Sequence, residues 1–309
     1  MARERWLIDC DTGYDDAVAL LMALRAPEIE VAGITVVNGN VPVDIGLANT
    51  LRVVELAEAP PSVPVARGAD RPLVEPRQHA THVHGEEGLC GYPLPEPARP
   101  VDPRPAAQFL VETIMASPTP VTLVLLAPLT NVALALRLEP RIVERIGRVV
   151  LMGGSADGTG NHTPAAEFNI AVDPEAAWIV FHSGLPITMV GLDPCRPTAV
   201  PVERRLAWQD SPSPRLRFLA GILDYLAREL GRPAVAIYDA VALSVALRPE
   251  IAKMRRLPAT VELAPGHHRG AVLVDRRTWR PTRPDWPEID VVFAVDCAEH
   301  ERLMLDRLR

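Results

Sequence analysis

The chain has 309 residues, of which 48% are hydrophobic and only 5% aromatic, and its formal net charge is -7. The negative charge argues against nucleic acid or an anionic membrane surface as the main partner. No uninterrupted apolar run approaches the roughly 20 residues that span a bilayer. Lys253 is the only lysine, so lysine-based covalent chemistry is not expected. We expect one domain over residues 1–309.

The cysteines predict a reducing compartment. The four of them lie far apart, at Cys10, Cys90, Cys195 and Cys297, and form no CxxC pair. That spacing supports neither a zinc site nor a disulfide framework.

The first apolar run follows Arg5 directly, and no hydrophobic core of an export signal precedes it. We therefore expect a cytoplasmic protein with reduced thiols.

Short runs rich in Val and Ile alternate with helical patterns over the first 190 residues. This alternation is typical of βαβ units and predicts an α/β fold, with a single open, mostly parallel, Rossmann-like sheet flanked by helices. We expect strands at Arg5–Asp9, Val31–Val37, Val63–Ala66, Val121–Leu126, Val149–Met152 and Ile187–Val190. We expect helices at Asp15–Arg25, Val43–Ala57, Ala106–Ala116, Asn131–Leu138 and Pro174–Ser183.

Two segments do not follow this alternation. Arg67–Pro105 is rich in Pro, His and Gly and is too long for a simple connection, which favours a functional loop. After Val190, helical patterns extend from Val202 to about Leu247. Strand-like pieces then follow, which we interpret as an extension of the same domain, at Ala259–Leu263, Ala271–Val274 and Ile289–Val295.

Four acids lie within eight residues of the chain, between the first predicted strand and the first predicted helix. They are Asp9, Asp11, Asp15 and Asp16, and Gly13 among them allows a sharp bend. A helix N-terminus stabilises each exposed acid by only about 0.3–1 kcal/mol, which is too little for four like charges. A hard cation such as Ca²⁺ or Mg²⁺ explains the cluster better, because no His or Cys cluster accompanies it. The alternative is that one acid caps the helix and the others are solvated.

Polar residues also follow the other predicted strands. Asn38 and Asn40 follow the second strand, Thr130 and Asn131 lie just beyond the fourth, and Met152 leads toward Asn161, Glu167 and Asn169. In open parallel sheets, ligands bind beyond the carboxyl ends of the strands. These side chains suit a polyhydroxylated ligand and a metal ion, so we expect the active site at this edge.

The same residues resemble those of a known family. Asp9 to Ala19 reads DxDTGxDDAVA, and further landmarks follow in order at Thr35–Val37 with Gly39-Asn40, His84-Gly85 with Gly88-Leu89, Pro128–Asn131, Met152–Gly154 and Glu167–Asn169. Their combination resembles the inosine–uridine-preferring nucleoside hydrolases. The resemblance implies a calcium-dependent N-ribosyl glycosidase of purine and pyrimidine salvage, which hydrolyses ribonucleosides to ribose and free base. We expect a homodimer or homotetramer that acts on this small-molecule substrate.

The resemblance also implies a role for each matching residue. Asp11, Asp16, Asp239 and the Leu126 carbonyl match calcium ligands, and Asp11 matches the general base that activates a calcium-bound water. Asp15, Asn40 and Asn169 match groups that bind the 2′- and 3′-hydroxyls. Asn161 and Glu167 match groups that hold the 5′-hydroxyl, and Met152 matches the residue that lies beneath the ribose. Candidates for the base side are His84, Tyr225 and Tyr238.

Tyr238 is a departure from the family pattern, in which many members have His just before the last aspartate. With an ordinary pKa of about 10, tyrosine is a poorer proton donor than histidine at neutral pH. Leaving-group activation and base preference therefore stay open. One alternative is a non-catalytic nucleoside- or ribose-binding relative. Another is a haloacid-dehalogenase-like phosphohydrolase, which also opens on DxD but leaves Asp15 and Asp16 unexplained.

Overall fold

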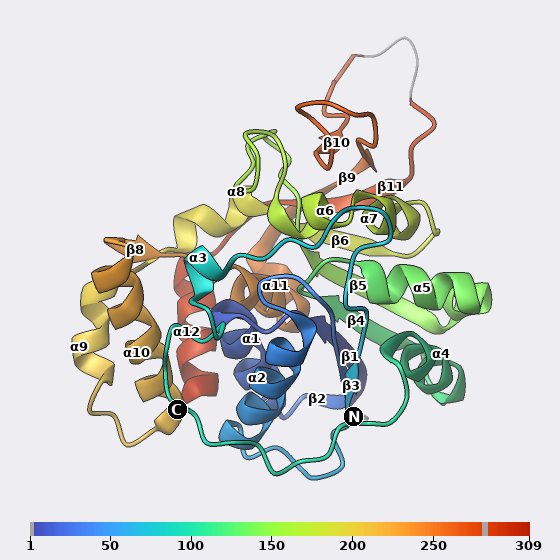
Figure 1. Cartoon of the computed structure of the whole chain (residues 1–309). Helices are drawn as coiled ribbons and strands as arrows, with labels where there is room; N and C mark the ends of the chain where they lie inside the picture. Colours follow the sequence, from blue (N-terminus) through green and yellow to red (C-terminus); the bar gives the residue numbers. More distant parts are fainter. Residues whose placement is uncertain (1–2, 280–283) are drawn as a thin grey trace.

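Nine strands of the computed structural model form one sheet, in the order β10-β9-β11-β6-β5-β4-β1-β2-β3 (Figure 1). The structure describes residues 3–279 and 284–309. The strands are β1 (Glu4–Cys10), β2 (Ile29–Val36), β3 (Val65–Arg67), β4 (Val121–Leu125), β5 (Ile146–Met152), β6 (Ile187–Val190), β9 (Ala252–Val261), β10 (Val272–Val274) and β11 (Glu288–Val295). A second, antiparallel sheet pairs β7 (Val200–Pro201) with β8 (Ala234–Val235).

Most of the large sheet is parallel. Neighbouring strands from β3 to β11 pair in the parallel sense, whereas β9 pairs antiparallel with both β11 and β10. The predicted α/β class and open, mostly parallel sheet are thus confirmed. Parallel neighbours need crossover connections, and most of the helices supply them.

The helices lie in two layers, one on each face of the sheet (Figure 1). One layer contains α1 (Tyr14–Leu24), α2 (Val43–Leu56), α10 (Pro214–Glu229), α11 (Tyr238–Leu247) and α12 (Cys297–Leu308). The other contains α4 (Ala106–Ala116), α5 (Thr130–Leu138) and α7 (Pro174–Phe181). Shorter helices are α3 (Thr81–His84), α6 (Phe168–Val172), α8 (Leu192–Cys195) and α9 (Arg205–Trp208), with 3₁₀ turns at Pro140–Arg145, Arg196–Thr198, Val202–Arg204 and Pro249–Ile251.

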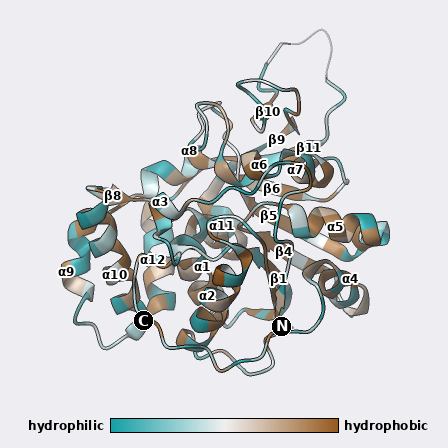
Figure 2. Cartoon of the chain, in the orientation of Figure 1, coloured by the Kyte–Doolittle hydropathy of each residue, from teal (hydrophilic) through white to brown (hydrophobic). Residues whose placement is uncertain are grey.

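Side chains on β1 alternate between the two layers, as strand geometry requires. Trp6, Ile8 and Cys10 belong to the hydrophobic cluster around α1, whereas Leu7 belongs to the cluster around α4 and α5. The central strands are mainly hydrophobic in Figure 2, while the outer end of α5 is largely polar. Helix α1 is buried from Tyr14 to Ala23, which agrees with its nearly uniform apolar sequence. This burial fixes the direction in which the acidic turn before α1 faces.

The strands and helices predicted up to residue 190 are found within a few residues of their expected bounds. Beyond that point the predicted strands Ala271–Val274 and Ile289–Val295 are found as β10 and β11, whereas other elements differ from the prediction. β9 starts at Ala252 rather than Ala259, because exposed Lys253, Arg255 and Arg256 hide its apolar pattern. Residues 202–247 are not continuously helical, since β8 interrupts them, and the charged helix α12 was not predicted. In Arg67–Pro105 the single helix is α3, and Arg67 is the last residue of β3. The rest is loop and turn, apart from an isolated bridge that Asp102 forms with Ala66.

None of the described helices is long and apolar enough to cross a membrane. All four cysteines are free, and Cys297 alone among them is exposed.

Candidate active site

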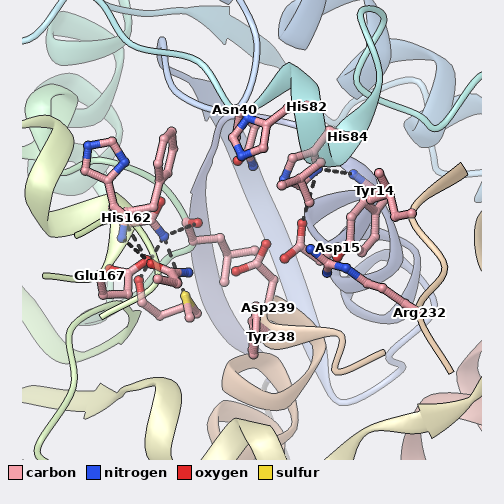
Figure 3. A pocket seen from close by; sticks show the side chains of 18 residues that line it. Tyr14, Asp15, Asn40, His82, His84, His162, Glu167, Arg232, Tyr238 and Asp239 are labelled. Atoms are coloured by element: carbon pink, nitrogen blue, oxygen red, sulfur yellow. Dashed lines mark hydrogen bonds and ion pairs between the residues drawn. The ribbon is translucent and has the colours of Figure 1, made fainter. Parts of the chain in front are cut away.

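A cavity of about 610 Å³ lies over the carboxyl ends of the central strands (Figure 3). Met152 ends β5, Leu126 follows β4, Asp11 follows β1, and Asn40 lies in the loop after β2. Because β5, β4, β1 and β2 are consecutive in the sheet, these residues form a row. The cavity is lined by Tyr14, Asp15, Asn40, Ala80, His82, Val83, His84, Leu126, Met152, Asn161, His162, Glu167, Phe168, Asn169, Leu230, Arg232, Tyr238 and Asp239.

Asp11 is held in place by hydrogen bonds from Asn40. The Asn40 backbone N–H donates to Asp11 Oδ2 at 2.6 Å, and the Asn40 side-chain amide donates to Asp11 Oδ1 at 3.1 Å. The same amide donates to Asp16 Oδ2 at 3.1 Å, so one asparagine joins both carboxylates. Asp16 also accepts from the backbone N–H groups of Asp11 and Gly13, at 3.1 and 3.0 Å. These bonds fix the turn between β1 and α1.

Three carboxylates face one another at the centre of this site. Asp15, Asp16 and Asp239 are buried, and each offers an oxygen that lies within 4.8 Å of the other two. Asp239 comes from the first turn of α11, far along the chain from the other two. Asp11 is bonded to Asn40 beside this group, as described above. All of these ligand atoms are oxygens, which suits a hard cation such as Ca²⁺.

Among the described residues, no lysine or arginine forms an ion pair with the carboxylates of this cluster. Burial and the negative charge of Asp16 raise the pKa of Asp15 to about 8, and burial raises the pKa of Asp16 to about 6. Burial and neighbouring carboxylates raise the pKa of Asp11 and of Asp239 well above the usual range. Asp15 Oδ1 has no hydrogen-bond partner among the described residues. A bound cation would supply the missing positive charge, so the residues present fit one.

His84 contacts this cluster but carries no charge at neutral pH. Its Nδ1 accepts a hydrogen bond from the Tyr14 backbone N–H at 3.3 Å and lies 3.9 Å from Asp15 Oδ1. Burial lowers the pKa of His84 to about 3. Its ring stacks on Tyr14, with the centroids 4.7 Å apart. His84 therefore lines the cavity as a neutral ring and does not offset the carboxylates.

Asp9 does not join the cluster, although the sequence places it in the same acidic turn. It lies on β1, where alternation directs it to the same face as Leu7. Its Oδ1 accepts hydrogen bonds from Thr35 Oγ1 at 2.5 Å and from Asn131 Nδ2 at 2.8 Å. Asp9 is therefore the one acid of the turn that lies apart from the group formed by Asp15, Asp16 and Asp239 and from Asp11 beside it.

Glu167 and Asn169 form the opposite wall of the cavity (Figure 3). Glu167 caps α6, because its carboxylate accepts from the backbone N–H groups of Asn169 and Ile170 at 2.9 and 3.3 Å, and also from Gly154 N–H at 2.9 Å. Burial raises the pKa of Glu167 to about 7. Asn161 Oδ1 accepts from the Phe168 N–H at 2.9 Å, which leaves its amide hydrogens available.

Asn169 joins the two central strands. Its side-chain amide donates to the carbonyls of Leu126 and Met152, at 2.9 and 3.1 Å. Its Oδ1 is therefore the side-chain atom left to accept a hydrogen bond from a ligand.

The candidates for the base side are not all brought into the cavity. His84 and Tyr238 line it, whereas Tyr225 does not, and its hydroxyl lies next to Gly85, the residue that follows α3. Sequence reasoning missed His162, Phe168 and Arg232, which also line the cavity. Arg232 carried one signal, since it follows a helix-ending glycine shortly before Tyr238 and Asp239.

Comparisons with known proteins agree with this geometry. The family model "Inosine-uridine preferring nucleoside hydrolase" matches residues 6–301. The chain belongs to this family. Nucleoside hydrolases cleave the N-glycosidic bond of ribonucleosides, and this chain is therefore an enzyme of that reaction class.

Similar proteins include enzymes with different named preferences. The pyrimidine-specific ribonucleoside hydrolase RihA of Salmonella paratyphi C is 38% identical over 308 residues, covering 98% of this chain and 97% of that protein. Its counterpart from Citrobacter koseri is 39% identical over 307 residues, with the same coverage. Among solved structures, a purine-preferring ribonucleoside hydrolase from Gardnerella vaginalis has a TM-score of 0.90 at 28% identity, covering 99% of this chain and 98% of that one. An inosine-guanosine nucleoside hydrolase has a TM-score of 0.89 at 30% identity, covering 99% of both chains.

Proposed function

We propose that this nucleoside hydrolase works with one Ca²⁺ ion held by Asp11, Asp16, Asp239 and the Leu126 carbonyl, with Asp11 as the general base. The observation that carries the proposal is a buried, all-oxygen cluster of carboxylates without a cationic partner among the described residues. When bound, Ca²⁺ would lower the pKa of a water molecule and hold the ribose diol. Asp15 lies close enough to this group to share in holding the ion or the diol.

The chain's own residues then orient the sugar. Asp15, Asn40 and Asn169 bind the 2′- and 3′-hydroxyls, and the thioether of Met152 lies beneath the ring. Glu167 accepts a hydrogen bond from the 5′-hydroxyl, with Asn161 beside it. This arrangement is supported by the two opposite walls of the cavity, one acidic and one formed by the cap of α6. Fixing the sugar relative to the attacking water supplies the orientation that speeds the reaction.

Asp11 takes one proton from the attacking water. The water oxygen forms a bond to C1′, the C1′–N bond breaks, and its electron pair leaves with the base. The transition state resembles an oxocarbenium ion, which nearby carboxylates stabilise. Asn40 keeps Asp11 in position by donating to both of its oxygens. The retained base argues against a ribose-binding protein without activity.

The test compares Asp11→Asn with Asp9→Asn by measuring ribose release from uridine and inosine with added Ca²⁺. Asp11→Asn should lower kcat by about 10²–10⁴-fold, the usual contribution of a general base. Asp9→Asn is a matched control, because Asp9 lies only two residues earlier and is equally buried. Its carboxylate is bonded to Thr35 and Asn131, whereas that of Asp11 is bonded to Asn40, which lines the cavity. Near-normal turnover by Asp11→Asn, or activity that survives a chelator, would contradict the mechanism.

We also propose pyrimidine ribonucleosides as natural substrates, since the enzymes named pyrimidine-specific share 38% and 39% of their residues with this chain. A one-domain, cytoplasmic homodimer or homotetramer is part of the same proposal. Sedimentation equilibrium of the purified chain tests the assembly, and a monomer at micromolar concentration would contradict it.

A further inference from the structure

Arg232 is a feature of the cavity that the mechanism above does not use. It is the one lining residue, among those described, that is a lysine or arginine, and it is half-buried. Its side chain forms no hydrogen bond or ion pair with any part of the chain that the structure describes. By contrast Arg228, one turn earlier, pairs with Asp224 at 3.1 Å. The guanidinium of Arg232 is therefore available to bind a ligand in this cavity.

The backbone holds Arg232 at the cavity. Gly231 has a φ of 62° and turns the chain out of α10, and the Arg232 N–H then donates to the Leu226 carbonyl at 3.2 Å. This is a glycine-dependent helix ending, in which a residue with side chain would be strained. Two residues later β8 begins and pairs with β7. Arg232 is thus fixed between a helix end and a short sheet.

Arg232 lies on the side of the cavity where a base would leave. Figure 3 shows it beside Tyr14 and Asp15, across the cavity from Glu167 and His162. With the 5′-hydroxyl at Glu167, the ribose directs C1′ and its base away from that wall, toward Arg232. Burial lowers the pKa of His84, and the positive charge of Arg232 lowers it further. Burial raises the pKa of Tyr238, and the charge of Arg232 offsets a smaller part of that rise. His84 and Tyr238 line the same cavity as Arg232.

We propose that Arg232 is a catalytic residue that donates hydrogen bonds to a carbonyl oxygen of the departing base. As the C1′–N bond breaks, its electron pair passes to the base, and in uracil or a 6-oxopurine the negative charge spreads onto that oxygen. The guanidinium stabilises this charge, and the base takes its proton from solvent afterwards. A fixed donor is most effective where charge develops in the transition state. This role accounts for the absence of the usual histidine, because a base that leaves as a stabilised anion needs no acid at Tyr238.

The inference rests on the proposed function and predicts a preference for oxo-bases. Uridine and inosine carry a carbonyl acceptor on the base, whereas adenosine does not and presents an amino group in its place. Arg232 should therefore favour the first two over adenosine. A nitrophenyl riboside leaves readily without help and serves as a substrate that needs no such donor.

The test measures kcat and KM of the purified full-length chain with Ca²⁺ on uridine, inosine, adenosine and 4-nitrophenyl riboside. Arg232→Met should lower kcat on uridine and inosine by about 10²-fold or more, as loss of a transition-state donor does. It should change the nitrophenyl riboside rate by less than about threefold, and Arg232→Lys should restore part of the loss by keeping the charge. Arg228→Met replaces an exposed arginine near the end of α10, four residues before Arg232, and should match the wild type on all four.

Equal losses on every substrate would show a structural role, and no loss on uridine would show that Arg232 takes no part; either result overturns the inference. A wild-type enzyme that releases ribose from none of the four contradicts the proposed function itself. Activity on the nitrophenyl riboside with an unselective Arg232→Met variant contradicts this inference alone. The two failures are therefore distinguishable.

Discussion

Replacing Gly39 by alanine should displace the general base without unfolding the protein. An ideal Cβ on Gly39 would lie 1.9 Å from Asp11 Oδ2, 2.7 Å from Cγ and 2.9 Å from Cβ of the same side chain. Since Cβ contacts below 3.0 Å are essentially never seen, the Asp11 oxygen must retreat by about 1 Å. The Asn40 N–H bond of 2.6 Å to that oxygen would then be lost or lengthened.

The expected effect follows from this displacement. A misplacement of about 1 Å can cost about 10²-fold in rate, so kcat of Gly39→Ala should fall by that order. Because Asp11 acts on the water, uridine and 4-nitrophenyl riboside should lose activity alike, unlike the selective loss expected at Arg232. The assay is ribose release, together with the thermal midpoint of unfolding. Gly147→Ala is the control, because its Cβ would meet nothing closer than Pro120 at 3.2 Å.

Wild-type kcat for Gly39→Ala, with an unchanged thermal midpoint, would refute the reasoning. It would mean either that the loop moves instead of Asp11 or that the position of Asp11 does not limit the rate. A crystal structure of the variant would distinguish these two explanations.

Three further predictions concern the metal, the sugar and stability. Ca²⁺ should raise the thermal midpoint, by the equivalent of about 2.7 kcal/mol at a hundred times its Kd, and Asp239→Asn should largely remove this shift in differential scanning fluorimetry. 2′-Deoxyuridine should be a far poorer substrate than uridine, by up to about 10⁴-fold, because the hydroxyl-binding groups would lose their partner; similar kcat/KM values for the two would disprove this. His300 is buried beside Ser244 Oγ at 2.9 Å, and burial lowers its pKa to about 4. The unfolded chain, with a histidine pKa of about 6.5, binds the proton first, so stability should decline as the pH falls from about 6.5 to 4, by up to about 3 kcal/mol. Urea unfolding of His300→Gln should show a weaker decline than the wild type over that range, and equal declines would exclude His300 as the cause.

Local sequence determined much of this protein. The acidic turn, the apolar strand before it and the apolar helix after it are neighbours in the chain, so their arrangement depends on few long-range contacts. The parallel sheet also followed from the alternation of Val- and Ile-rich runs with helical patterns, because parallel strands need crossovers. With the sheet class known, the polar residues that follow each strand had to meet at one edge. The family motifs lie at these same positions after the strands, so their order along the chain follows the order of the strands.

Tertiary structure decided which of those residues share one space. Asp239 enters the acidic group from the start of α11, and only the packing of α11 against α1 brings it there. Asp9 lies apart from this group, because its position on β1 directs its side chain to the other face of the sheet, where it is bonded to Thr35 and Asn131. Arg232 reaches the cavity because β7 and β8 pair across a long stretch of chain. Such contacts join distant segments, and no local pattern of apolar and polar residues encodes which distant side chains will meet.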